Sequence, residues 1–224
     1  MLGVVSVNHE LLNAVRSARG RLAETGPVRT RAEGDFDLVA LPAEDGDVLR
    51  DLLLAERASV VIEVGLAYGS SALAIAEALA ARERPGARHL IIDPFQHLFH
   101  DAGWEAIGPA HDAGLSTLLR ERSQLVLPRL LSEGLVADAA FVDGSHIFHN
   151  VFVDLYFLRE VVRPGGLLVL DDYQWPSVAT AVRYFELNTG WTPVPAGATR
   201  LRAFRLPDPR VEPSFEDFKP FQPA

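Results

Sequence analysis

Three aspartates in this chain directly follow apolar segments that have the length of buried strands. Asp143 ends the segment ADAAFVD, and the pair Asp171 and Asp172 follows LLVL at residues 167–170. The chain between them is long enough for a helix, a turn and a strand, which places the acids at neighbouring strand ends. Such carboxylates repel one another unless a cation is bound, and Mg²⁺ and Ca²⁺ prefer oxygen ligands. We therefore expect Asp143, Asp171 and Asp172 to bind a divalent metal; alternatively, the acid pair caps a helix.

Two histidines follow the first of these acids, His146 and His149 in DGSHIFH. An imidazole with an ordinary pKa near 6.5 can accept a proton at neutral pH. We expect Asp143 and His146 to be catalytic residues, with His146 as the general base. The alternatives for His146 are a cofactor contact or a position next to the metal, and His149 is expected to be structural or exposed.

A glycine-containing loop in VIEVGLAYGSS connects an apolar strand segment to a helical segment. Gly65 and Gly69 would let the backbone turn tightly and approach a ligand, and Ser70 could cap the helix or bind the ligand. Asp93 ends the next strand segment, HLIID, where a carboxylate can accept both hydroxyls of a ribose. These residues predict a nucleoside-cofactor site, and the alternative is a loop that binds nothing.

The same loop differs from the G-x-G-x-x-G pattern of dinucleotide-binding proteins. Glu63 stands two residues before Gly65, and a carboxylate there would repel phosphates and suit a ligand with a positive charge. An NAD-dependent oxidoreductase is therefore disfavoured, although it remains an alternative.

At these residues the chain resembles the class I S-adenosylmethionine-dependent methyltransferases, whose acidic E/D-x-G-x-x-x-G loop holds the amino-acid end of the cofactor. The segments AFVDGSH and PGGLLVLDDYQW extend the resemblance to the small O-methyltransferases of the catechol/caffeoyl-CoA and macrocin/novobiocin groups, over about residues 40–190. This resemblance implies methylation of a small hydroxylated metabolite, assisted by Mg²⁺ or by Ca²⁺ in its place. The acceptor itself is not specified by the sequence, and hydroxyl, amine and carboxylate groups remain open.

Within this resemblance, Ser123 and Gln124 match the position that lines the adenine. One departure concerns the base, because catechol-type enzymes carry a lysine just after their first metal aspartate and this chain has Gly144, Ser145 and His146 there. The residue pattern and the resemblance together assign cofactor contacts to Glu63, Gly65, Tyr68, Gly69, Ser70, Asp93, Ser123, Gln124 and Asp143.

Strand-like and helix-like segments alternate from residue 58 onward, and this alternation must position the residues above. The order predicts an α/β, Rossmann-like, doubly wound, mostly parallel seven-stranded sheet with helices on both faces. Residues 200–207 alternate polar and apolar side chains, as expected for an antiparallel edge or hairpin strand. Because ligands bind beyond the carboxyl ends of parallel strands, the acids should converge at one edge.

The segments outside this pattern divide the chain into three predicted regions. Residues 1–40 form an N-terminal helical extension, 41–206 form the S-adenosylmethionine-binding methyltransferase domain, and 207–224 form a tail rich in Pro and Phe. The extension and the tail are left over once the sheet is built, so we expect them to mediate a homodimer. A catalytically silent, methyltransferase-like assembly module is therefore a further alternative.

Composition limits the partners of the chain. The net charge is −9 and the basic residues are scattered, which argues against a nucleic-acid partner and favours a small-molecule substrate. There are no cysteines, which excludes disulfides and thiolate nucleophiles. No apolar run approaches the roughly 18 residues of a membrane span, and the N-terminus lacks a secretory pattern. We therefore expect a cytoplasmic protein without a membrane partner.

Overall fold

The computed structural model describes residues 2–82, 84–197 and 199–220 and contains one seven-stranded sheet with the order β3-β2-β1-β4-β5-β7-β6. Strands β1 to β5 are parallel to one another, and β7 is antiparallel to both β5 and β6. The predicted α/β class with a mostly parallel sheet is confirmed. The strands are β1 Val60–Val64, β2 Arg88–Ile92, β3 Ser116–Leu119, β4 Ala137–Val142, β5 Val162–Leu170, β6 Thr192–Val194 and β7 Arg202–Arg205.

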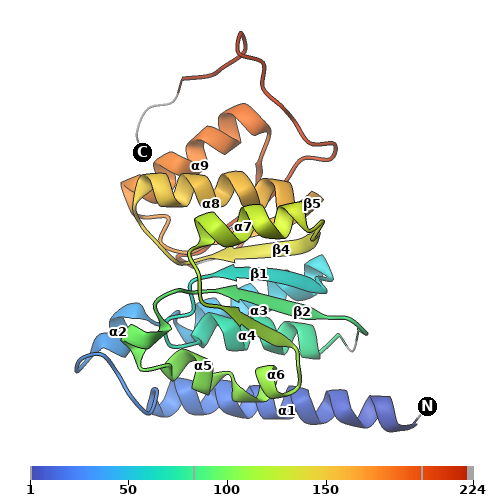
Figure 1. Ribbon diagram of the computed structural model, residues 1–224, viewed down its shortest axis with the longest axis vertical. Coiled ribbons are helices and arrows are strands. Elements are labelled where there is room, and N and C mark those ends of the chain that lie inside the picture. The colour runs from blue at the N-terminus through green and yellow to red at the C-terminus, as the bar shows by residue number, and fades with distance from the viewer. Residues whose placement is uncertain (1, 83, 198, 221–224) are drawn as a thin grey trace.

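Helices cover both faces of the sheet (Figure 1). One face carries α3 (Ala43–Glu56) and α4 (Ser70–Ala80), and the long α1 (Leu2–Thr25) packs against α4. The other face carries α7 (Ser123–Ser132), α8 (Phe148–Val161) and α9 (Pro176–Thr189). Short helices complete the connections: α2 Asp35–Val39, the 3-10 helix η1 Gln96–Phe99, α5 Ala102–Ala106 and α6 Gly108–Asp112.

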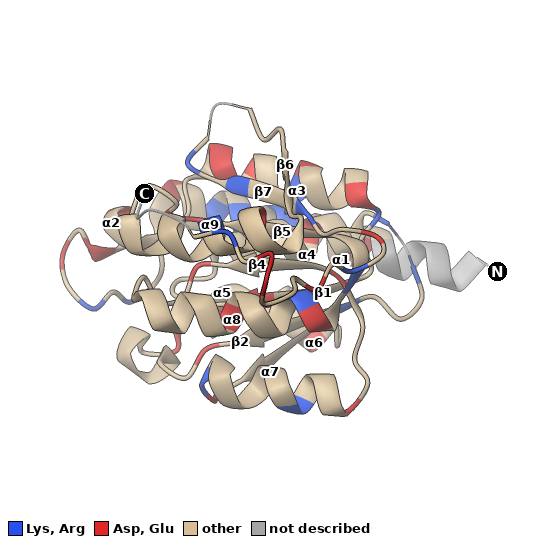
Figure 2. Cartoon of the chain, turned by 90° about the horizontal axis from the view of Figure 1, so that it is seen from above, with Lys and Arg blue, Asp and Glu red and all other residues tan. Residues whose placement is uncertain are grey.

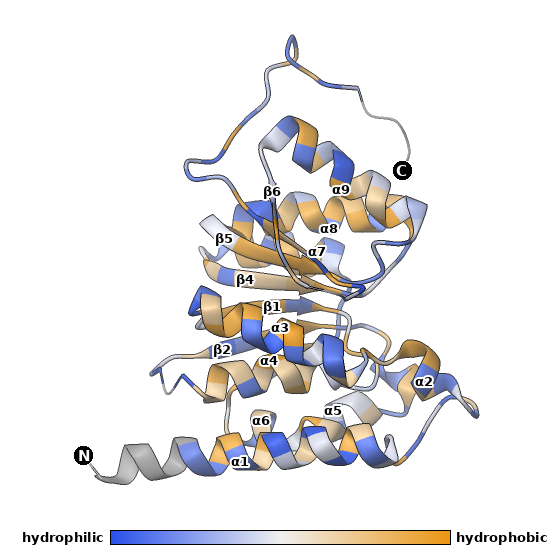
Figure 3. Cartoon of the chain, turned by 180° about the vertical axis from the view of Figure 1, so that it is seen from behind, coloured by the Kyte–Doolittle hydropathy of each residue, from blue (hydrophilic) through white to orange (hydrophobic). Residues whose placement is uncertain are grey.

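The sheet separates two apolar cores. Successive side chains of a strand point to opposite faces, so Val61 packs into the core beneath α1, α3 and α4, whereas Ile62 and Val64 pack into the core beneath α7, α8 and α9. Figure 3 shows that hydrophobic residues predominate in β5 and α4, whereas hydrophobic and hydrophilic residues alternate along α1. Acidic and basic residues are spread over several helices and loops rather than gathered on one element (Figure 2). Both faces of β1 and β4 are therefore buried, as expected for central parallel strands.

Two local features shape the connections and the edge of the sheet. The connection before α3 contains the short helix α2. The segment Arg163 to Gly166 lies within β5, where the pairing with β4 is irregular. The strand expected at residues 200–207 is β7, which lies between β5 and the outermost strand β6.

The C-terminal tail contacts the domain through polar groups. Arg159 of α8 donates a hydrogen bond to the carbonyl of Val211 (3.1 Å). Asn188 of α9 donates to the carbonyl of Lys219 (3.1 Å) and accepts from its amide (2.8 Å). These contacts hold the tail against α8 and α9. The predicted domain boundaries at 40/41 and 206/207 stay predictions. Among the described residues, no helix has the length and apolarity required to cross a membrane.

Candidate active site

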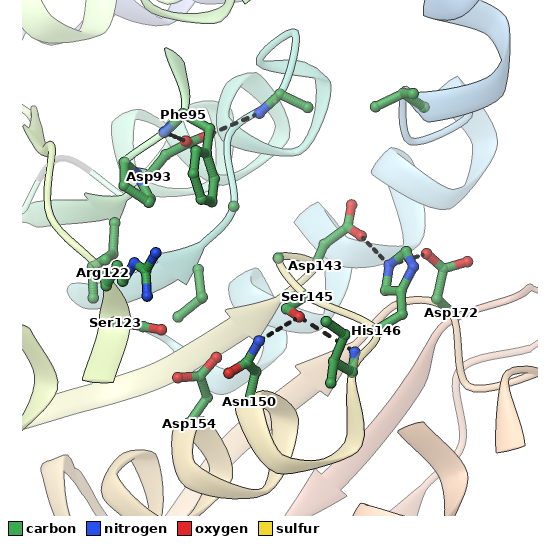
Figure 4. A pocket seen from close by; sticks show the side chains of 18 of the residues that line it. Asp93, Phe95, Arg122, Ser123, Asp143, Ser145, His146, Asn150, Asp154 and Asp172 are labelled. Atoms are coloured by element: carbon green, nitrogen blue, oxygen red, sulfur yellow. Dashed lines mark hydrogen bonds and ion pairs between the residues drawn. The ribbon is translucent and has the colours of Figure 1, made fainter. Parts of the chain in front are cut away.

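A cavity of about 540 Å³ opens at the carboxyl ends of the central strands (Figure 4). Its wall is formed by the segments that follow β1, β2, β4 and β5, by the N-terminal segment that includes α2, and by the starts of α7 and α8. The volume lies within the range of roughly 300–1,000 Å³ that is typical of small-molecule sites. The sheet topology therefore places the cavity at the edge where the acidic strand ends were predicted to meet.

Two of the three predicted metal ligands meet His146 in this cavity. The Nε2 of His146 lies 2.8 Å from Oδ2 of Asp172 and 4.0 Å from Oδ1 of Asp143. One donor atom from each of the three residues lies within 4.8 Å of the others. Figure 4 shows the imidazole between the two carboxylates. The loops after β4 and β5 thus assemble a compact group of two carboxylates and one imidazole.

Asp171 points away from this group, which differs from the expectation. Its buried carboxylate accepts hydrogen bonds from Nη2 of Arg200 (2.5 Å) and from the backbone amide of Asp172 (2.7 Å). The described residues that line the cavity include Asp143 and Asp172 but not Asp171. The guanidinium of Arg200 therefore balances the charge that the sequence left unpaired at Asp171.

The close packing of these groups changes their proton affinities. Burial raises the pKa of Asp143 to about 7, against the hydrogen bond from His146. Hydrogen bonds to Asp143 and Asp172 raise the pKa of His146 to about 10 and keep the imidazole protonated at neutral pH. In this state His146 is a donor, so the predicted role as a general base requires the carboxylates to be neutralised first.

Gly65 brings the loop after β1 against the loop after β4. Its φ is +97°, and a Cβ atom there would lie 2.2 Å from the carbonyl oxygen of Asp143. Gly69 has φ +86°, and its Cβ would lie 2.9 Å from the carbonyl oxygen of Gly103. No other residue type fits at Gly65 without displacing backbone, because a 2.2 Å contact is far inside the van der Waals limit.

Glu63, Tyr68, Gly69 and Ser70, which were predicted to contact the cofactor, do not line the cavity. Glu63 is fully buried on the other face of β1, where it accepts from the hydroxyl of Ser71 and pairs with His89 at 2.9 Å. The hydroxyl of Tyr68 accepts from the backbone amide of Arg31 (3.0 Å) and donates to Asp35. Tyr68 therefore positions the wall of the cavity through Arg31, which lines it, whereas the contacts of Glu63 lie on the opposite face of the sheet.

The remaining predicted residues lie in the wall: Gly65, Asp93, Ser123, Gln124, Asp143 and His146. Asp93 is held firmly, because its Oδ2 accepts from the amide of Leu66 (3.0 Å) and from Nε2 of Gln96 (3.0 Å). Its Oδ1 accepts from the amide of Phe95 (2.7 Å). The carboxylate thus joins the loop after β1 to the loop after β2.

Residues 62–173, which are half of the chain, match the sequence profile of a methyltransferase domain family. The chain belongs to this methyltransferase family. The match covers the glycine loop, Asp93, Asp143 and the acid pair, which are the residues that carry the resemblance. The methyltransferase family predicted from the sequence is confirmed.

Solved structures share the fold of this methyltransferase. The O-methyltransferase TomG from Streptomyces achromogenes, in complex with S-adenosylmethionine, is 21% identical, with 91% of this chain and 90% of that chain covered and a TM-score of 0.60. The O-methyltransferase from Bacillus cereus, in complex with S-adenosylhomocysteine, is 16% identical (89% and 90% covered, TM-score 0.60). CalS11, a TDP-rhamnose 3′-O-methyltransferase, is 18% identical (86% and 93%, TM-score 0.58). No curated protein matches the chain.

Sequence reasoning missed four charged residues in the cavity wall of the methyltransferase: Arg31, Arg122, Asp154 and Arg200. Asp154 carried a readable signal, because it stands at helical spacing between Val151 and Leu158 on the buried face of α8. An acid on an apolar face is rarely buried without a functional or structural reason. The three arginines lie outside the helices and strands, where a basic side chain is usually exposed and gives no such signal.

The buried Asp154 predicts a pH-dependent stability. Burial raises its pKa from the ordinary 3.8 to about 7, so ionisation disfavours folding, and stability is lost as the pH rises from about 4 through 7. The free energy of unfolding of Asp154→Asn should match that of the wild type near pH 4 and exceed it by up to about 4 kcal/mol at pH 8. The variant should therefore melt at a higher temperature than the wild type at pH 8. Circular dichroism melts across this pH range measure the difference.

Asp138→Asn is the matched control, because backbone and Arg163 hydrogen bonds outweigh burial and lower the pKa of Asp138. Its ionised form stabilises the fold, so this variant should lose stability above pH 4. If the melting temperatures of Asp154→Asn and the wild type changed in the same way with pH over the whole range, the raised pKa of Asp154 would be contradicted.

Proposed function

We propose that this methyltransferase transfers the methyl group of S-adenosylmethionine to an oxygen atom of a small hydroxylated metabolite, with a divalent cation at the site. The observation that carries the proposal is the group of Asp143, His146 and Asp172 in the same cavity as the Gly65 loop. The loop would bind the methyl donor, and the group beside it would bind the acceptor oxygen. The relatives TomG and CalS11, which share the fold, are O-methyltransferases.

The order of the strands supports one orientation of the cofactor. The methyl group must face Asp143 and Asp172, which follow β4 and β5. Asp93 follows the neighbouring strand on the other side of β1, where a carboxylate can accept ribose hydroxyls. The base would then lie farther in the same direction, where Ser123 and Gln124 at the start of α7 line the cavity. The positive sulfonium would lie near carboxylates, which favour a cation.

The donor groups fit a divalent cation. Asp143, His146 and Asp172 offer donor atoms within 4.8 Å of one another, close enough for one ion to contact all three. Two carboxylates with water molecules suit Mg²⁺, our expected metal, or Ca²⁺; coordination by the imidazole would shift the preference toward Mn²⁺. Asp171 is excluded from this set by its pairing with Arg200. When bound, the cation would hold the acceptor hydroxyl and lower its pKa.

The residues of the chain then orient and deprotonate the acceptor. If the two carboxylates alone held the cation, the hydrogen bonds that keep His146 protonated would be lost, and its uncoordinated imidazole would accept the proton of the acceptor hydroxyl. Gly65 holds the cofactor loop in contact with Asp143, which places the methyl donor next to the acceptor. Methyl transfer needs little beyond this in-line placement.

Apolar side chains at the cavity mouth favour an acceptor with an apolar or aromatic part. Leu38, Phe95 and Ile147 line the cavity and are exposed to solvent. Trp175 is also exposed, and its ring stacks on that of His146 with the centroids 6.5 Å apart. An acceptor that covers these groups would bury apolar surface on binding, which is favourable.

The proposal predicts metal-dependent turnover of oxygen acceptors. Formation of S-adenosylhomocysteine should be detected with some members of a panel of catechols, phenols and sugars in the presence of Mg²⁺. EDTA in excess should abolish the activity, and added Mg²⁺ or Mn²⁺ should restore it. Mass spectrometry of the product locates the methyl group on oxygen. Full activity in EDTA would refute the role of the metal, and methylation of amine acceptors alone would refute oxygen as the acceptor.

We also propose that the enzyme is a cytoplasmic homodimer, in line with the exposed Phe215 of the tail and the length of α1. Light scattering would measure its mass, and a monomer at all concentrations would contradict this assembly.

A further inference from the structure

Asp154 is a buried acid in the cavity wall that the proposed chemistry does not use. Its residue is 2% exposed, and it lines the cavity from the second turn of α8. Its Oδ1 has no hydrogen-bond partner among the described residues. A buried polar atom without a partner is costly, so such an atom in a cavity wall indicates a donor that arrives with a ligand.

The neighbours of Asp154 leave this position open for a ligand. Burial raises the pKa of Asp154, and among the described residues the hydroxyl of Ser123, at the start of α7, lowers it by a smaller amount. Asn150, one turn earlier on α8, donates its amide to the hydroxyl of Ser145 (3.0 Å). Figure 4 shows Asp154 between Ser123 and Asn150, away from Asp143, His146 and Asp172. Asp154 therefore belongs to the end of the cavity that lies opposite the proposed metal site.

This end is where the base of the cofactor lies if the proposed function holds, since the methyl group faces Asp143 and the ribose faces Asp93. A 6-aminopurine presents a donor at its exocyclic nitrogen, whereas a 6-oxopurine presents an acceptor at the same position. A carboxylate oxygen accepts hydrogen bonds and repels a carbonyl oxygen. Asp154 thus matches the amino form of the purine and not the oxo form.

We propose that Asp154 accepts a hydrogen bond from the exocyclic amino group of the cofactor's adenine and thereby selects adenosyl over inosyl cofactors. The inference rests on the proposed function, and it assigns Asp154 a specificity role. Ser123 would hold the carboxylate in place on one side, and the α7–α8 contact would keep water out on the other.

Equilibrium binding of two ligands tests this role. Isothermal titration at about pH 9, where Asp154 with its pKa of about 7 is ionised, should show that the wild type binds S-adenosylhomocysteine about 10–100-fold more tightly than S-inosylhomocysteine, which is the range expected for one hydrogen bond to a charged group. Asp154→Asn can donate to the 6-oxo group, so its preference should fall to near unity or reverse. Asp138→Asn makes the same isosteric change outside the cavity and should keep the wild-type ratio.

The outcomes separate this inference from the proposed function. If the folded wild type binds neither ligand, both fail. If it binds both ligands equally, or if Asp154→Asn keeps the full preference, the inference fails and the proposed function stands. Equal binding of the two ligands by the wild type would overturn the inference even if Asp154→Asn does not fold.

Discussion

Asp172→Asn is expected to lower kcat/KM by about 10²–10³-fold while leaving the affinity for S-adenosylhomocysteine unchanged. Asp172 faces His146 at 2.8 Å and lies in the group that would hold the cation and the acceptor oxygen. The substitution keeps the shape of the side chain but removes the charge that binds the cation. Steady-state kinetics at saturating Mg²⁺, together with isothermal titration of S-adenosylhomocysteine, measure both parameters.

Asp112→Asn is a suitable control, because Asp112 is an exposed acid at the end of α6 that does not line the cavity. It should leave kcat/KM and cofactor affinity at wild-type values. Wild-type kcat/KM in Asp172→Asn would show that the acid group does not take part in methyl transfer.

Arg200→Met is expected to destabilise the fold by about 3–5 kcal/mol. The side chain of Asp171 is fully buried, and the guanidinium of Arg200 is the cation paired with it. Removal of Arg200 leaves a buried carboxylate without its partner, and this is more costly than the loss of the pair as a whole. Urea unfolding followed by tryptophan fluorescence measures the free energy of unfolding.

The double variant Arg200→Met with Asp171→Leu separates the two contributions. It should recover most of the lost stability, because no buried charge remains. A loss below about 1 kcal/mol in Arg200→Met alone would place this pair among surface ion pairs of small effect.

The strand ends could be predicted because their signals are local. Short apolar segments that end in Asp93, Asp143 and Asp171 indicated strands, and parallel topology brings such ends to one edge. The prediction that both Asp171 and Asp172 enter the cavity neglected the alternation of strand side chains. Asp171 continues β5 and faces Arg200, whereas Asp172 has a φ of +57° and turns into the cavity.

The same alternation explains Glu63. Val64 lines the cavity and Glu63, its neighbour on β1, points to the opposite face and pairs with His89. The alternation of side chains along β1 could therefore have predicted that Val64, and not Glu63, faces the cavity. The partners could not be predicted, since His89 and Arg200 reach their acids through long-range contacts of the folded chain.

Titration of S-adenosylhomocysteine into the wild type and into Gly65→Ala tests the central claim most directly, because this claim places the cofactor against the loop after β1. A Cβ at residue 65 would lie 2.2 Å from the carbonyl oxygen of Asp143 and must displace that loop. We predict micromolar or tighter binding to one site in the wild type. Gly65→Ala should keep the circular dichroism spectrum of the wild type but show no measurable binding. A folded wild type that binds no S-adenosylhomocysteine at millimolar concentration would contradict the account.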